Sequence, residues 1–152
     1  MKSLADPKEA RLLVDRLRRL TPQSARLWGR MTVQEMVCHV ADAYRHSMGE
    51  IPPSPVDTLL TRNVIKPVAL WFPLRWPPGY PTRPEVDPQR EGRKPGDFVR
   101  DRDQVETEMY RFIEAAHRGA LAKHAIFGRM SSREWLRWGW LHADHHLRQF
   151  SE

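Results

Sequence analysis

Apolar residues recur every three or four positions in four stretches of the chain, and no stretch shows the strict alternation typical of a β-strand. The first stretch follows Asp6, a capping residue that forms a capping box with Glu9, and Pro7, which suits the first helical position. It continues for about four turns. The second opens with a capping box of Thr32 and Glu35 and stops at Gly49. Both stretches are therefore predicted to be helices.

Two further helices are expected in the second half of the chain. The third runs from about Asp101 to Gly119, with apolar residues on one face and charges on the other. The fourth follows a second capping box, formed by Ser131 and Glu134, and continues to Phe150. Four amphipathic helices predict an all-α fold, a four-helix bundle, in which sites are commonly built from side chains on facing helices.

A long connection separates the second and third predicted helices. Residues 57–72 are apolar enough for a broken helix with Pro67 at the break. Residues 73–97 contain seven prolines and are predicted to lack regular secondary structure. We expect this Pro-rich crossover to wrap the bundle, fixed by Trp71, Trp76 and Tyr80; a lid or a dimer surface is the alternative.

Length and composition restrict the class of protein. With 152 residues the chain is long enough for one compact domain and too short for two ordinary ones, so residues 1–152 are predicted to form one domain. No apolar stretch approaches the roughly 20 residues that cross a bilayer, and the first residues lack the apolar segment of a secretory signal. We therefore expect a cytoplasmic protein without a membrane partner. The single cysteine, Cys38, excludes an internal disulfide and is interpreted as a small buried hydrophobe.

The chain carries 25 Lys and Arg against 19 Asp and Glu, a net charge of +6. Such a surplus can indicate an anionic partner such as nucleic acid. Because the acidic residues are interspersed among the basic ones, we favour an arginine-rich surface without a nucleic-acid partner.

Histidines gather near the end of the chain. His142 and His146 are four positions apart on the last predicted helix, so they differ by about 40° in azimuth, stand roughly 6 Å apart and could bind one ion. A catalytic-type divalent site needs a third protein ligand and an open position. The candidates for that third ligand are His39, His46 and His124. His39 and His46 lie roughly 10 Å apart along the second helix, so only one can join the pair, and counting along the helices does not decide which.

Two segments carry a resemblance to a known superfamily. The pairing of "LWGRMTVQEMVCHVADA" with "HAIFGRMSSREWLRWGWLHADHHLRQF" resembles the DinB-like superfamily of proposed metalloenzymes. The similarity is strongest to a subgroup known as a domain of unknown function, with the ending H-x-x-H-H-x-x-Q-F. It spans nearly the whole chain and includes "GDFVRDRDQVETEMYRFI".

The resemblance implies a DinB-like four-helix bundle that holds a divalent ion with one histidine of the second helix and two of the last. Matched residue by residue, "VCHVAD" supplies His39, and "HADHH" supplies His142 and His146. His46 stays the alternative third ligand.

Other polar residues are expected around the three ligands. His145 matches a position that is often histidine and not usually a ligand, which favours an indirect role. Gln149 keeps its match to the Gly-Gln of the broader superfamily, whereas the glycine is replaced by Arg148. Gln149 and Glu35 lie one turn from ligands and could accept their second N–H groups. His124 could cap the open side, or be an ordinary surface loop residue.

Three neutral imidazoles with an open position favour zinc, with nickel as the second choice. A metal in such a site would polarise a water or a thiolate, which favours a metal-dependent hydrolase or thiol transferase acting on a small molecule. The resemblance implies the same, because characterised relatives include transferases that use low-molecular-weight thiols. No Ser-His-Asp order or glycine-rich phosphate loop is present, so no catalytic residue is assigned.

Two alternatives concern partners. The first is a non-enzymatic basic helical bundle that binds an anionic partner such as nucleic acid, with incidental histidines. The second is self-association, since a small bundle with exposed tryptophans and a Pro-rich crossover has material for a homodimer interface.

Overall fold

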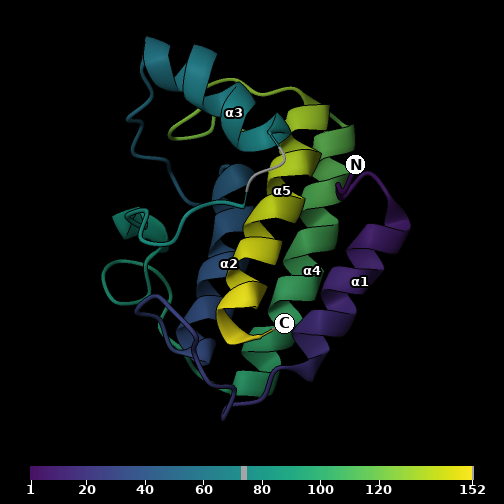
Figure 1. Cartoon of the computed structure of the whole chain (residues 1–152), viewed down its shortest axis with the longest axis vertical. Coiled ribbons are helices and arrows are strands. Elements are labelled where there is room, and N and C mark those ends of the chain that lie inside the picture. The colour runs from purple at the N-terminus through teal and green to yellow at the C-terminus, as the bar shows by residue number, and fades with distance from the viewer. Residues whose placement is uncertain (73–74, 152) are drawn as a thin grey trace.

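The computed structural model describes residues 1–72 and 75–151, which form helices and no β-strand (Figure 1). The five α-helices are α1 (Pro7–Arg19), α2 (Val33–Ser47), α3 (Lys66–Trp71), α4 (Phe98–His117) and α5 (Ser132–Leu147). A π-helical segment, η1 (Thr61–Ile65), precedes α3, and two 3₁₀ turns are η2 (Pro84–Val86) and η3 (Arg148–Phe150). The bundle consists of α1, α2, α4 and α5, so the all-α prediction is confirmed. None of the described helices is both long and apolar enough to span a bilayer.

Local capping signals determine where the bundle helices begin. The capping boxes predicted at the starts of α2 and α5 form. The one predicted at α1 does not, because the Asp6 backbone N–H donates to the Ser3 carbonyl, although the Asp6 side chain caps by accepting the Lys8 N–H at 2.9 Å. The predicted start of the third helix at Asp101 is wrong, because Asp97 caps α4 by accepting the backbone N–H of Arg100. Asp101 lies instead inside the first turn, where its side chain is buried.

The centre of the bundle is aromatic and closely packed. Tyr44 of α2 and Phe112 of α4 are completely buried, with ring centroids 5.0 Å apart. Gly139 lets α5 approach this pair, since a Cβ at that position would lie 2.7 Å from a ring carbon of Phe112. The Tyr44 hydroxyl donates to the Gly139 carbonyl at 3.1 Å. These contacts fix α2 and α5 relative to each other, and that relation places the histidines.

The crossover between α2 and α4 has a helical part and an irregular part. The predicted break at Pro67 is wrong, because residues 59–71 are helical throughout. The π-helical segment η1 directly before α3 accommodates Pro67, which has no N–H to donate. The segment from residue 59 to α3 projects from the bundle (Figure 1), and it exposes Leu59, Leu60, Val64, Ile65, Val68 and Phe72. Trp71 and Trp76 pack against the core as expected. Tyr80 is 66% exposed, so its prediction as an anchor is wrong.

Candidate metal centre

Three histidines from two helices meet between α2 and α5. His39 comes from α2, and His142 and His146 come from consecutive turns of α5; one nitrogen of each lies within 4.8 Å of the others. The Nε2 atoms of His39 and His142 are 3.3 Å apart. Two nitrogens bound to one tetrahedral zinc ion at about 2.0–2.1 Å stand roughly 3.3 Å apart. This pair already has the separation that a shared ion requires.

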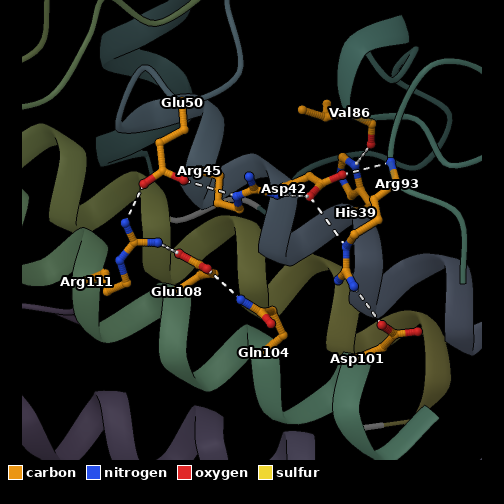
Figure 2. Close-up of polar contacts among 10 residues, drawn as sticks. All are labelled: His39, Asp42, Arg45, Glu50, Val86, Arg93, Asp101, Gln104, Glu108 and Arg111. Atoms are coloured by element: carbon orange, nitrogen blue, oxygen red, sulfur yellow. Dashed lines mark hydrogen bonds and ion pairs between the residues drawn. The ribbon is translucent and has the colours of Figure 1, made fainter. Parts of the chain in front are cut away.

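The outward nitrogen of His39 is held by the crossover. Its Nδ1 lies 2.7 Å from the backbone carbonyl oxygen of Val86, in η2 (Figure 2). Because a carbonyl oxygen only accepts, Nδ1 carries the proton and donates it. The lone pair is then on Nε2, the nitrogen that faces His142. The imidazole is fixed in the tautomer that can bind a metal.

His146 is held in the same way from the end of the chain. Its Nδ1 lies 2.7 Å from Oε1 of Gln149, so Nδ1 donates and Nε2 keeps its lone pair. Gln149 is itself anchored, since its carbonyl accepts the Leu27 N–H at 2.7 Å. Gly29 lies against the Gln149 amide with a φ of +87°, and a Cβ there would stand 2.7 Å from Nε2 of that amide.

His142 is positioned by an aromatic face. Its ring stacks on Trp138, with centroids 4.9 Å apart and an interplanar angle of 15°. Its Nδ1 is buried and has no hydrogen-bond partner among the described residues. The other two rings lie close by, at centroid distances of 5.1 Å to His39 and 4.7 Å to His146.

Burial keeps the three imidazoles neutral. It lowers the pKa of His39 below the usual 6.5, although the hydrogen bond to Val86 acts in the opposite direction. It also lowers the pKa of His142 and the pKa of His146 well below 6.5, and the neighbouring histidines lower both further. Neutral imidazole is the form that ligates metals, so the three side chains are ready to bind near pH 7.

Two other predicted histidines lie outside the group of three. His145 lies beside it, with its ring 4.8 Å from Trp28 and 6.0 Å from Trp76; burial lowers its pKa to about 4. His46 is directed to Glu85, with 3.6 Å between Nε2 and Oε1. The structure groups His39, and not His46, with the pair, and His39 as the third ligand stays a prediction.

The expected partner role of Glu35 is wrong. Its carboxylate accepts the Thr32 N–H at 2.8 Å, as the capping box requires, and an amide N–H of Gln89 at 3.0 Å. The carboxylate is therefore committed to the helix start, and the Val86 carbonyl replaces it as the acceptor for His39. No side-chain pattern could have revealed Val86, because it acts through its backbone.

His124 and Cys38 both serve the packing. The His124 Nδ1 accepts the N–H groups of Ile126 and Phe127, each at 3.1 Å, so the ring holds a turn before α5 and does not join the three histidines. His124 is buried, which excludes the surface-loop interpretation. Cys38 is completely buried as expected, and burial raises the pKa of its thiol to about 12.

Comparison with known proteins gives a family and no function. No curated protein and no solved structure matches the chain. A family model described as a protein of unknown function, DUF1569, matches residues 4–152. The match covers the first helix, the crossover and the histidine-rich end alike. The chain therefore belongs to DUF1569, a family of proteins of unknown function.

Proposed function

We propose that the chain is a DinB-like protein that binds one divalent metal ion through His39, His142 and His146. One observation carries the proposal: three buried imidazoles converge, and those of His39 and His146 donate their outward N–H groups to fixed acceptors. A buried imidazole pair used only for packing does not need its lone pairs directed inward. Ligating histidines characteristically have this arrangement.

Zinc is the metal we propose, with nickel as the second choice. Three neutral nitrogen ligands leave a fourth tetrahedral position open, which is typical of catalytic zinc sites. When bound, such an ion supplies a Lewis acid that activates a water or thiol ligand. The proposed activity is accordingly that of a hydrolase or a thiol-dependent transferase acting on a small molecule.

Aromatic residues beside the three histidines support a site for a small molecule. Trp76 lies 6.5 Å from His142 and 6.0 Å from His145, measured between ring centroids, and Trp28 lies 4.8 Å from His145. Rings of this size exclude water, which strengthens electrostatic interactions at a reacting group. We propose that Trp28 and Trp76 flank the substrate and that the substrate includes a low-molecular-weight thiol or a comparably small electrophile.

The charge pattern supports this proposal over a basic bundle that binds an anionic partner. Buried carboxylates already occupy many guanidinium groups, as in the pairs of Arg30 with Asp87, Arg93 with Asp101 and Arg111 with Glu108. Arginines paired with buried carboxylates contribute less to the field that attracts a polyanion. The net charge of +6 is therefore weaker evidence for a nucleic-acid partner than the number of arginines suggests.

Metal analysis tests the proposal directly. The protein is stripped with a chelator, reloaded with zinc, washed and measured by elemental analysis, and we expect about one zinc ion per chain. Replacing His39, His142 or His146 by Ala should remove most of it, since two imidazoles seldom retain zinc. His46→Ala and His117→Ala, on α2 and α4, are matched controls that should keep the full complement. Equal zinc in all five variants would disprove the site.

A further inference from the structure

We propose that Arg93 is a positioning residue for the metal centre, holding the crossover so that the Val86 carbonyl stays on His39. The role of Arg93 rests on the proposed function, because it requires His39 to be a metal ligand. The contacts that support it are those of the crossover. Arg93 does not contact the three histidines in any described interaction. Its effect would reach them through the backbone of residues 86–93.

Two of the contacts between the crossover and α2 lie one turn apart, at His39 and Asp42. The Val86 carbonyl accepts Nδ1–H of His39 at 2.7 Å, and the Arg93 backbone N–H donates to Oδ2 of Asp42 at 3.0 Å (Figure 2). His39 and Asp42 are three positions apart and therefore lie on one face of the helix. The two bonds thus place residues 86–93 along that face.

The Arg93 guanidinium extends this attachment to α4. Its Nη1 donates to Oδ1 of Asp101 at 2.6 Å, and its Nε lies 3.8 Å from Oδ1 of Asp42 (Figure 2). The second oxygen of Asp101 accepts the Gly96 N–H at 2.7 Å. Both carboxylates are almost completely buried. Loss of the guanidinium would leave the buried Asp101 without this ion pair and Asp42 with Arg45, at 3.5 Å, as its remaining described cation, which favours movement of the crossover.

The backbone between Arg93 and Val86 is too tightly packed to absorb such a movement. Gly92 donates its N–H to the Asp87 carbonyl at 2.9 Å, and a Cβ on Gly92 would lie 2.8 Å from the carbonyl carbon of Val86. Asp87 is completely buried and paired with Arg30. A shift at residue 93 therefore displaces the Val86 peptide, and His39 loses its acceptor.

Arg111 provides a matched control in the same region. Its Nη1 donates to the buried carboxylate of Glu108 at 2.6 Å, and its Nη2 donates to Glu50 (Figure 2). Arg111→Met therefore removes the same charge and leaves a buried carboxylate, as Arg93→Met does. The described contacts of Arg111 do not include residues 86–93, the part of the crossover that holds His39. If loss of charge alone matters, the His39 tautomer and the zinc affinity will change in both variants. If Arg93 positions the crossover, they will change in Arg93→Met alone.

The first measurement uses the metal-free protein and so does not depend on metal binding. Long-range ¹H–¹⁵N spectra of protein labelled at histidine report which nitrogen of His39 carries the proton. We expect Nδ1–H in the wild type and in Arg111→Met, and a mixture of tautomers in Arg93→Met. An Nδ1–H tautomer unchanged in Arg93→Met would overturn the inference, whatever the outcome for the metal.

The second measurement is zinc affinity by competition with a chelating dye. Losing an outer acceptor typically weakens metal binding 10- to 100-fold, so we expect about that loss in Arg93→Met and a change within about threefold in Arg111→Met. Arg93→Lys, which keeps the charge, should recover part of the affinity. If Arg93→Met fails to fold, Asp101→Asn breaks the same ion pair more gently and should shift affinity in the same direction. Equal losses in the Arg93 and Arg111 variants would indicate a merely structural role. A wild type without zinc would refute the proposed function and leave the tautomer result to decide the positioning role.

Discussion

Each imidazole of the proposed centre is held by a different kind of contact. His39 uses a backbone carbonyl, His146 a side-chain amide and His142 the face of an indole ring. Two of these supports come from segments outside the helices that carry the histidines. Rigid ligands lose little conformational freedom when a metal binds, so these contacts should raise the affinity of the site.

Gly29→Ala tests one of these supports, because Gly29 lies against the Gln149 amide. Both Gly29, at φ +87°, and Gly79, at φ +88°, have left-handed backbones, so alanine should cost about 1–2 kcal/mol of unfolding free energy at either site. Only at Gly29 does the new methyl group displace the amide that accepts from His146. We expect zinc affinity to fall about tenfold in Gly29→Ala and to stay unchanged in Gly79→Ala. Denaturant unfolding and zinc titration of both variants measure the two effects, and equal zinc affinities would contradict the role of Gly29.

At the scale of single residues, part of the proposed site could be predicted from the sequence. The spacing of His142 and His146 predicted a convergent pair, and the resemblance selected His39 over His46. Gln149, one turn beyond His146, was within reach of the same helical reasoning. The Val86 carbonyl was not, because it lies 47 residues from His39 along the chain and its side chain takes no part. Glu35 was misassigned because two roles, capping and support of His39, competed for one carboxylate.

At the scale of elements, local signals located the bundle helices and long-range contacts arranged the crossover. Capping residues act within one turn, so the starts of α1, α2 and α5 were predictable. The start of α4 was not, because the apolar pattern placed it near Asp101, whereas Asp97 caps the helix and Asp101 lies buried beside Arg93. The path of residues 84–97 depends on ion pairs with α2 and α4, which no local pattern contains.

Gly139→Ala tests how closely α5 packs on α4. Alanine favours helix by about 1 kcal/mol over glycine, but its methyl group would lie 2.7 Å from the completely buried Phe112 ring. Overpacking of this kind typically costs about 1–3 kcal/mol, so we expect net destabilisation of up to about 2 kcal/mol by denaturant unfolding.

A double variant identifies the cause of that destabilisation. Phe112→Leu makes room for the methyl group, so the combined Gly139→Ala and Phe112→Leu variant should lose less stability than the sum of its single changes. A strictly additive result would show that the ring does not limit the approach of the helices.

At the scale of the whole molecule, histidine burial makes stability depend on pH. Burial lowers the pKa of His124 to about 3 and the pKa of His145 to about 4, and it also lowers the pKa of His39, His46, His142 and His146. In the unfolded chain these groups titrate near 6.5. Between about pH 6.5 and pH 4 the unfolded chain therefore binds more protons than the folded one, and the free energy of unfolding falls as pH falls.

The metal-free protein should accordingly be most stable above about pH 6.5 and lose stability steadily in acid. One such group contributes a slope of at most about 1.4 kcal/mol per pH unit. His124→Asn removes one of them while its side-chain oxygen can still accept the N–H groups of Ile126 and Phe127. We expect a less stable protein at pH 7. Between pH 6 and pH 4, the slope of its unfolding free energy against pH should fall by the amount that corresponds to about one bound proton. Urea unfolding at several pH values measures the slope in both proteins. An unchanged slope in His124→Asn would mean that His124 does not resist protonation in the folded state.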